Sequence, residues 1–246
     1  MKLINLPNII TCCNLLCGSM AIYFGMHGRL DIASCSIIGG AVFDFFDGLT
    51  ARALHISGPI GKELDSLADM VTFGVAPSVL AYCTLTLVIS GQTADCIAAN
   101  NSWFFLGAML MAAFSALRLA KFNCDERQSL SFIGLPTPAN ALFWIGLCAL
   151  VQIPVVREAC AGLSWWAVVL WAVLLLGLSI LLISEVPMFS LKIKPGHMGL
   201  SENLTRYVFI LLAAIVLIAA LLTGCLLASF APIILMYILF SIFNNR

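Results

Sequence analysis

Long apolar stretches limit what this chain can fold into more than any other feature. Of its 246 residues, 62% are hydrophobic and only 10% are charged, whereas about half of a soluble domain is apolar. Several uncharged stretches reach the roughly 20 residues that an α-helix needs to cross a bilayer. The alternation of apolar and polar residues that a transmembrane barrel requires is missing. The sequence therefore predicts an all-α, polytopic membrane helical bundle.

About eight transmembrane helices are expected, joined by short connections. No linker, low-complexity segment or clear internal repeat divides the chain, so residues 1–246 are predicted to form a single membrane domain. The apolar stretch at the start is not expected to be a cleaved signal, because no small-residue cleavage site follows it. The predicted spans cover residues 8–27, 31–54, 59–90, 101–122, 136–152, 164–183, 204–223 and 226–242.

Lysine and arginine are distributed unevenly among the predicted connections. If both ends of the chain lie in the cytoplasm, all of the 12 Lys and Arg residues except Arg29 and Arg157 fall on or near the cytoplasmic side. This positive-inside bias predicts a protein of the cell (inner) membrane with that orientation. The net charge is zero and no basic run is present, so no nucleic-acid partner is expected.

The ten cysteines contain no C-x-x-C pair, so a zinc or iron–sulfur site is not expected. Most lie in apolar segments, where cysteine acts as a small hydrophobic residue. Cys96 and Cys160 fall in connections assigned to the outer side, where disulfides persist. A bridge between these two residues is therefore a hypothesis.

Four aspartates gather in an otherwise apolar part of the chain. Asp44 and Asp47 are three residues apart, and Asp65 and Asp69 are four apart, so each pair shares one face of its helix. The short connection between the two helices contains turn and helix-start residues. We therefore predict an antiparallel hairpin within residues 31–90 whose carboxylate pairs face each other near the cytoplasmic surface.

Carboxylates that converge at low dielectric repel one another strongly, so this hairpin is expected to bind cations. All-oxygen ligands favour Mg²⁺, Mn²⁺ or Ca²⁺ over zinc, and two such ions can hold a phosphate during in-line displacement. Gly48, Ala51 and Gly61 leave room for a bulky phosphate ligand, and Arg52 can pair with its charge. Ordinary solvated charges are the alternative interpretation, but acidic residues within membrane segments are usually functional.

The spacing D-x2-D-G-x2-A-R-x8-G-x3-D-x3-D runs without a gap from Asp44 to Asp69. It resembles the signature of the CDP-alcohol phosphotransferases. The resemblance implies an integral membrane homodimer that binds two divalent cations. It also implies transfer of a phosphatidyl or similar group from a CDP-linked donor to an alcohol, with release of CMP. By the same resemblance Asp44, Asp47, Asp65 and Asp69 are metal ligands, and Asp69 is also the general base.

The resemblance also suggests which residues bind the donor. Gly48, Ala51, Arg52 and Gly61 would hold the CDP moiety. Polar residues of the first span, Asn8 and Thr11, would contribute to the same donor site, although polar contacts between helices are the alternative. Gly58 stands where a Ser or Thr is expected near the donor, so the adjacent Ser57 is the candidate for that role.

Further segments are similar to the phosphatidylserine synthase branch of this family, which transfers the phosphatidyl group of CDP-diacylglycerol to L-serine. The resemblance covers the first six or so spans and implies that Arg118, Lys121 and Asn123 bind substrate. Lys121 departs from the arginine usual in that branch. The segments are "LPNIITCCNLLCG" (6–18), "GKELDSLADMVTFGVAP" (61–77), "RLAKFN" (118–123) and "FIGLPTPANA" (132–141).

Three alternatives stay open from the sequence. Another enzyme of the family could use a phosphorylated acceptor such as glycerol 3-phosphate, because basic residues are not scarce at the cytoplasmic end. Arg118 and Lys121 could instead be positive-inside anchors at helix ends. A cation-coupled transporter would also place carboxylates in the membrane, but it usually shows internal repeats and interrupted helices near the midplane.

Overall fold

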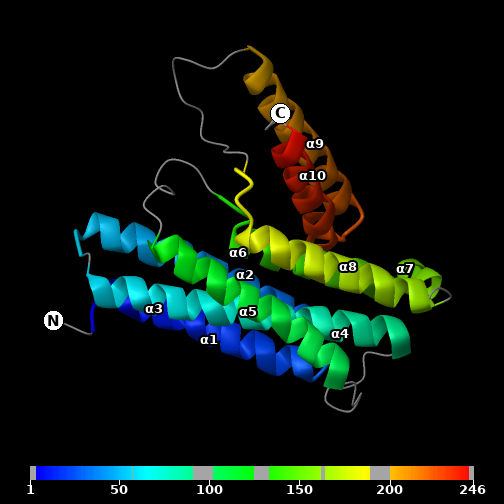
Figure 1. The fold of residues 1–246 in the computed structure, drawn as a ribbon, viewed down its shortest axis with the longest axis horizontal. Coiled ribbons are helices and arrows are strands. Elements are labelled where there is room, and N and C mark those ends of the chain that lie inside the picture. Colours follow the sequence, from blue (N-terminus) through cyan, green and yellow to red (C-terminus); the bar gives the residue numbers. More distant parts are fainter. Residues whose placement is uncertain are drawn as a thin grey trace.

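The structure is a computed structural model that describes residues 4–56, 58–90, 102–124, 133–161, 164–188 and 200–243. These residues form a helical bundle (Figure 1). Its elements are α1 (Leu6–Met26), α2 (Leu30–Ala53), α3 (Pro59–Asp69), a π-helical segment η1 (Met70–Val75), α4 (Ala76–Ser90), α5 (Ser102–Cys124), α6 (Thr137–Gln152), α7 (Pro154–Ala161), α8 (Ser164–Ile183), α9 (Leu200–Leu222), a 3-10 turn η3 (Leu226–Ser229) and α10 (Phe230–Phe243).

The helices confirm the predicted all-α membrane architecture. Six helices in the described part of the chain are long and apolar enough to cross a membrane, and the bent pair of α6 and α7 would add a seventh. The predicted span at 204–223 corresponds to α9. Its apolar portion, Arg206–Leu222, is shorter than the six helices counted above. About eight spans is consistent with this set, and the chain is an integral membrane protein. That residues 1–246 form one domain stays a prediction.

The predicted span at 136–152 ends at a sharp corner. The axes of α6 and α7 differ by 90°, and Ile153 between them is extended, with φ −66° and ψ 123°. A residue that precedes proline avoids the helical region, so Pro154 explains why α6 stops there. Cys160 lies in α7, and its suggested partner Cys96 lies outside the described residues, so their pairing stays a hypothesis.

The helical segment Pro59–Ser90 is the central span of the bundle. It begins as α3, passes through η1 and continues as α4, in which the residues from Ala76 to Val88 are buried. Helices α1, α2, α5, α6 and α8 all contact α4. Trp171 of α8 donates a hydrogen bond from Nε1 to the carbonyl oxygen of Ala81 at 2.9 Å. The buried half of this span therefore fixes the direction of its acidic half.

Two glycines bring the first two helices against the π-helical segment. A Cβ atom on Gly18 of α1 would collide with Thr72 Oγ1 and lie 2.8 Å from the Thr72 Cα. A Cβ atom on Gly40 of α2 would lie 2.5 Å from Thr72 Cγ2. The hydroxyl of Thr72 donates to the Asn14 carbonyl oxygen at 3.0 Å. Close packing and one hydrogen bond thus join α1, α2 and η1.

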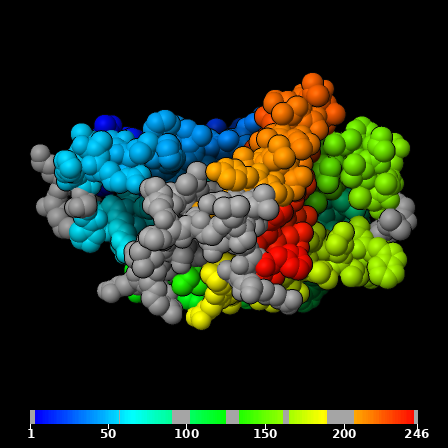
Figure 2. All heavy atoms as spheres, turned by 90° about the horizontal axis from the view of Figure 1, so that it is seen from above, coloured from blue at the N-terminus to red at the C-terminus, as the bar shows by residue number. Residues whose placement is uncertain are grey.

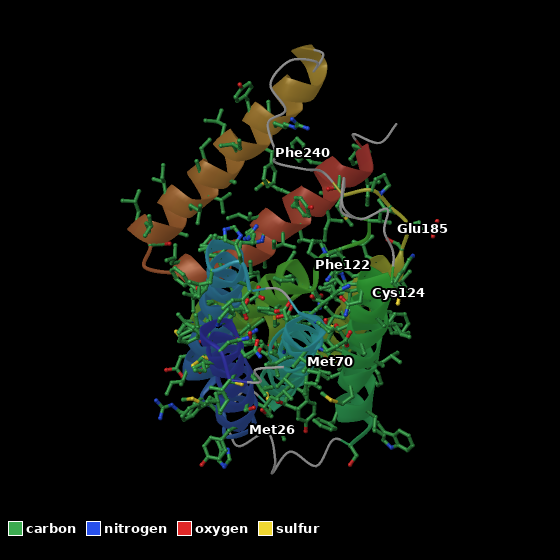
Figure 3. The ribbon with its side chains drawn as sticks, turned by 90° about the vertical axis from the view of Figure 1, so that its left-hand side faces the viewer. Met26, Met70, Phe122, Cys124, Glu185 and Phe240 are labelled. Atoms are coloured by element: carbon green, nitrogen blue, oxygen red, sulfur yellow. The ribbon has the colours of Figure 1, made fainter. Side chains whose placement is uncertain are left out.

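The last two helices form a hairpin that leaves the rest of the bundle at an angle (Figures 1 and 3). Its base is held by α6, where Gly146 lies against the backbone of Ala231. Figure 2 shows the hairpin, orange to red, running across the face turned to the viewer. Many large apolar side chains of α9 are exposed, among them Leu211 and Leu222, which suits a helix surrounded by lipid.

Gly40→Ala should destabilise the protein, because the added methyl group would lie 2.5 Å from Thr72 Cγ2 and 2.9 Å from Asn14 Oδ1. We expect a loss of about 1–3 kcal/mol in the free energy of unfolding, the usual cost of overpacking an interior. Gly39→Ala on the same helix is the matched control, since its methyl group would meet Cys17 Sγ at an ordinary 3.7 Å. Thermal unfolding in detergent compares the two variants. Equal melting temperatures would contradict this account of the helix contact.

Candidate metal and substrate site

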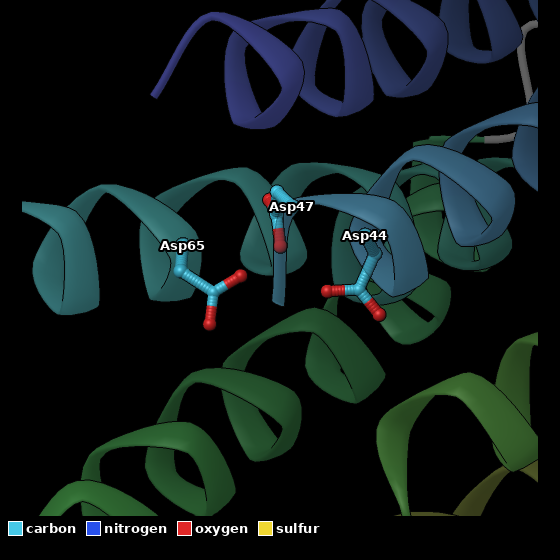
Figure 4. Close-up of side chains that lie close together, drawn as sticks. All are labelled: Asp44, Asp47 and Asp65. Atoms are coloured by element: carbon cyan, nitrogen blue, oxygen red, sulfur yellow. The ribbon is translucent and has the colours of Figure 1, made fainter. Parts of the chain in front are cut away.

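Three carboxylates meet where α2 passes α3. Asp44 and Asp47 come from α2 and Asp65 from α3, and one oxygen of each lies within 4.8 Å of the others. Figure 4 shows the three side chains together, with α1 (dark blue) and α5 (green) on opposite sides of them. The structure therefore brings three of the four predicted aspartates into one group that can bind a metal ion.

The local sequence explains why these carboxylates converge. Asp44 and Asp47 are one helical turn apart and project from the same face of α2. The chain then reverses after Ala53, and His55 takes a left-handed conformation with φ 53°. Pro59 starts α3 near its first helical position, where proline is favoured because no backbone N–H is needed. The tight reversal sets Asp65 opposite the two aspartates of α2.

The group lacks protein partners for part of its charge. Asp47 is only 6% exposed. Among the described residues, Asp47 Oδ2 and Asp65 Oδ1 are buried with no hydrogen-bond partner. The ion pairs recorded for the described residues join other side chains, Arg29 with Asp31 and Lys121 with Glu185. Burying unpaired charge is costly, and hard divalent cations take carboxylate oxygens as ligands. This set of donors therefore fits such a cation.

Asp69 lies one helical turn beyond Asp65, outside the group of three. Its Oδ1 accepts a hydrogen bond from Asn14 Nδ2 of α1 at 3.2 Å. It is near enough to Asp44 and Asp65 for mutual repulsion, and it attracts the guanidinium of Arg118. The fourth aspartate thus belongs to the same acidic centre but has a different set of neighbours.

A cavity of about 870 Å³ opens beside the carboxylates at the ends of α1, α2 and α3. Its walls include most of the residues that were predicted to bind the donor. Arg52 is one of them, and its Nε donates to the Gly48 carbonyl oxygen at 3.0 Å. The predicted residues in the lining are Asn8, Thr11, Asp47, Gly48, Ala51, Arg52, Gly61 and Asp65.

The glycines in the lining have open space beside them. A Cβ atom on Gly48 would lie 3.9 Å from the nearest guanidinium nitrogen of Arg52, and one on Gly61 would lie 3.4 Å from Asn8 Oδ1. Neither position is closed by a packed neighbour, so close helix packing does not account for these glycines. They leave space that a ligand can fill.

Among the predicted substrate-binding residues that the structure describes, Arg118, Lys121 and Asn123 do not line this cavity. Ser57 lies outside the described residues. Arg118 is buried in α5 and donates to Thr137 Oγ1 at 3.1 Å, with its guanidinium 5.5 Å from the ring centre of Phe122. Lys121 Nζ, near the end of α5, lies 3.5 Å from Glu185 Oε1. These three residues, and Asn123 described below, keep their predicted roles as proposals.

A small hydrogen-bond network joins α3 to α5 beside the cavity. Lys62 Nζ donates to the Asn123 carbonyl oxygen at 3.0 Å, and Asn123 Nδ2 donates to Ser66 Oγ at 2.8 Å. Lys62 also lines the cavity. The network fixes the end of α5 relative to the acidic helix.

Several residues of this region were not among the predicted site residues. Asn14 is fully buried in α1 and bonds to Asp69, and its polarity within an apolar span was the available signal. Asn5 accepts from the Asn8 backbone N–H at 2.9 Å and so caps α1 at the cavity. His55 also lines the cavity, and no spacing in the sequence pointed to it. Thr72 could be recognised only once the helices were packed.

Comparison with known proteins agrees with this arrangement. Residues 4–178 match the model of the CDP-alcohol phosphatidyltransferase family. A CDP-diacylglycerol–serine O-phosphatidyltransferase of Bacillus subtilis is 36% identical over 149 residues, which cover 59% of this chain and 73% of that protein. The protein of the same name from Mycobacterium leprae is 31% identical over 252 residues, covering 98% of this chain and 75% of that protein.

The similarity extends beyond these bacteria. A protein of the same name from Methanocaldococcus jannaschii is 30% identical over 151 residues, which cover 61% of this chain and 64% of that protein. The matched region of the family model contains α1 to α5 and all four aspartates. The chain therefore belongs to the CDP-alcohol phosphatidyltransferase family.

Proposed function

We propose that the protein is a CDP-diacylglycerol–serine O-phosphatidyltransferase, which transfers a phosphatidyl group from CDP-diacylglycerol to L-serine and releases CMP. The observation that carries this proposal is the group of Asp44, Asp47 and Asp65. It lies beside a cavity whose walls hold four further residues of the same motif, Gly48, Ala51, Arg52 and Gly61. The relatives reported above bear this enzyme name and support serine as the acceptor.

The acidic residues have two roles in this proposal. Asp44, Asp47, Asp65 and Asp69 would hold two divalent cations. The oxygen ligands suit Mg²⁺, Mn²⁺ and Ca²⁺. Such ions, when bound, neutralise the phosphates and make CMP a better leaving group. The unpartnered oxygens of Asp47 and Asp65 support the assignment.

The reaction forms one bond and breaks one bond at phosphorus. The serine hydroxyl oxygen bonds to the phosphorus that carries diacylglycerol, the bond from that phosphorus to the CMP oxygen breaks, and CMP leaves with the bonding electrons. The hydroxyl proton passes to the carboxylate of Asp69, because an alcohol is a weak nucleophile at neutral pH and needs a base within hydrogen-bond reach. Asp69 suits this role because it lies outside the group of three.

We assign the donor nucleotide to the cavity. Asn8 and Thr11 of α1 would contact the cytidine or ribose, and Gly48, Ala51 and Gly61 would let the pyrophosphate approach the backbone. Arg52 supplies a fixed positive charge on the wall, and guanidinium groups pair well with phosphate. Ser57 is proposed as a further donor contact. The cavity, at about 870 Å³, is in the size range of small-molecule sites and has room for the nucleoside diphosphate part of the donor.

We assign the acceptor to the α5 side of the carboxylates. Arg118 is 8% exposed, lies near Asp69 and has donors that could bind the carboxylate of serine. Lys121 and Asn123 follow it on α5 and would complete this side. A buried arginine is an unusual membrane anchor, because an anchoring cation reaches the interface, so its burial favours a binding role.

The orientation and the assembly are also proposals. The positive-inside bias supports an inner-membrane protein whose cavity faces the cytoplasm. The exposed tryptophans at the starts of α5 and α8, Trp103, Trp165 and Trp166, suit the opposite interface. A homodimer is proposed from the family resemblance, and the mass of the detergent-solubilised complex distinguishes one copy from two.

Purified protein supplied with CDP-diacylglycerol and serine should release CMP. EDTA should abolish the release, and Mg²⁺ or Mn²⁺ should restore it. Asp65→Asn should lower kcat roughly 100-fold or more, because it removes a charge that the proposed cation needs. Asp31→Asn is the control, since Asp31 lies on α2 but pairs with Arg29. CMP release that survives EDTA would contradict the proposed chemistry, and solute uptake without CMP would favour a transporter.

Arg118→Met should raise the KM for serine about 10-fold to 100-fold, the usual effect of losing hydrogen bonds to a charged group. The KM for CDP-diacylglycerol should change little, because Arg118 does not line the cavity. Arg29→Met, which changes an exposed arginine, is the control. The assay includes glycerol 3-phosphate as a competing acceptor. If the protein uses glycerol 3-phosphate in preference to serine, glycerol 3-phosphate is the acceptor and the serine assignment is wrong. If the KM for serine does not change in Arg118→Met, Arg118 does not bind the acceptor.

Sealed membrane vesicles test the orientation. In inverted vesicles made from cells that produce the protein, serine and CMP in the outer medium have direct access to a cavity that faces the cytoplasm. Added serine should therefore be incorporated into lipid, and CMP should appear in the medium without detergent. Right-side-out vesicles should need detergent for the same activity. The reverse result would place the cavity on the outer side and contradict the assignment from lysine and arginine.

A further inference from the structure

Asn14 occupies an unusual place in the apolar helix α1. Its side chain is fully buried, with 0% exposed. Its Nδ2 donates to Asp69 Oδ1 at 3.2 Å, and Oδ1 of the same amide is buried without a partner among the described residues. A buried amide with an unsatisfied oxygen costs free energy, so a benefit to its neighbour is the natural explanation for an asparagine here.

The surrounding helices fix the position of this amide. The backbone carbonyl of Asn14 accepts a hydrogen bond from Thr72 Oγ1 at 3.0 Å. Gly40 of α2 makes space for the side chain, since a Cβ atom on Gly40 would lie 2.9 Å from Asn14 Oδ1. Asn14 is therefore held both by its backbone and by the fit of its side chain between α2 and η1.

Asp69 needs such a fixed donor. The last torsion of an aspartate side chain is broad, so the carboxylate can rotate unless a partner holds it. Asp44 and Asp65 repel it electrostatically, and this repulsion favours rotation away from the acidic centre. A hydrogen bond from a fixed amide to Oδ1 opposes that rotation.

We propose that Asn14 is the positioning residue for Asp69: its amide holds the carboxylate of the proposed base in the orientation that receives the proton of the acceptor alcohol. This inference rests on the proposed function. Asn14 is not a catalytic residue, because it acts through Asp69 and does not line the cavity. The competing explanation is that Asn14 only holds helices together, as buried amides do in many membrane bundles.

The first comparison separates positioning from helix packing. Asn14→Leu removes the amide at similar volume, and Asn14→Asp keeps the shape but replaces the donor with an acceptor. Both should lower kcat roughly 10-fold to 100-fold, the range typical for partners that orient a functional group, with little change in the KM for CDP-diacylglycerol. Trp171→Phe removes a hydrogen bond between α8 and α4 that involves neither Asn14 nor Asp69, so it should lower thermal stability and leave kcat near the wild-type value.

A double-mutant cycle gives the sharper result. If Asn14 acts through Asp69, Asn14→Leu should have little further effect on the residual activity of Asp69→Asn, because interacting residues are strongly non-additive. A residue that only packs helices would lower that residual activity by the same factor as in the wild type. Ser34→Ala, at another buried polar site on α2, is the control for loss of a buried polar group.

The outcomes are distinguishable. Wild-type kcat in folded Asn14→Leu or Asn14→Asp overturns the positioning role, as does an additive effect in the cycle. A fall in kcat that Trp171→Phe reproduces also overturns it in favour of packing. If the wild-type protein releases CMP, each of these results rejects the inference alone. Failure of the wild-type protein to release CMP from CDP-diacylglycerol and serine rejects the proposed function, and the inference with it.

Discussion

Mutual repulsion among the aspartates is the constraint on which the rest of this structure depends. Carboxylates that share one site inside an apolar bundle raise its energy strongly, and the unfolded chain would keep them apart. The helices must therefore hold them together against that repulsion, which a bound cation would neutralise. This explains why the acidic residues sit on helices that are packed firmly elsewhere, and not on a loop that could relax.

The packing that opposes the repulsion is visible in the neighbours of the acidic centre. Helix α4 is buried along nearly its whole length. The π-helical segment η1 joins it to α3, which carries Asp65 and Asp69. Gly18 and Gly40 let α1 and α2 approach the Thr72 backbone and side chain. Small residues serve two purposes in this protein: near Thr72 they allow helices to touch, and at Gly48 and Gly61 they leave space for a ligand.

The sequence predicted the parts of the site that depend on short-range spacing. Asp44 and Asp47 had to share a helix face, and the short turn had to bring Asp65 opposite them. It could not predict that Asp69 has Asn14 of α1 as a hydrogen-bond partner, because that contact depends on how a distant helix packs. The contact of Lys62 with α5 was missed for the same reason. Such features arise from the packing of helices, which the periodicity of one segment does not describe.

The π-helical segment Met70–Val75 stands between the aspartates of α3 and the buried length of α4. A π-helical turn holds one residue more than an α-helical turn, and each residue rotates a helix by about 100°. Deleting a single residue from this segment would turn α3 about its axis relative to α4 and point its carboxylates toward a different neighbour. A change in the length of this six-residue segment would therefore rotate the acidic face of α3 relative to the buried face of α4. Every aspartate would still be present, but the carboxylates would no longer point in the same direction.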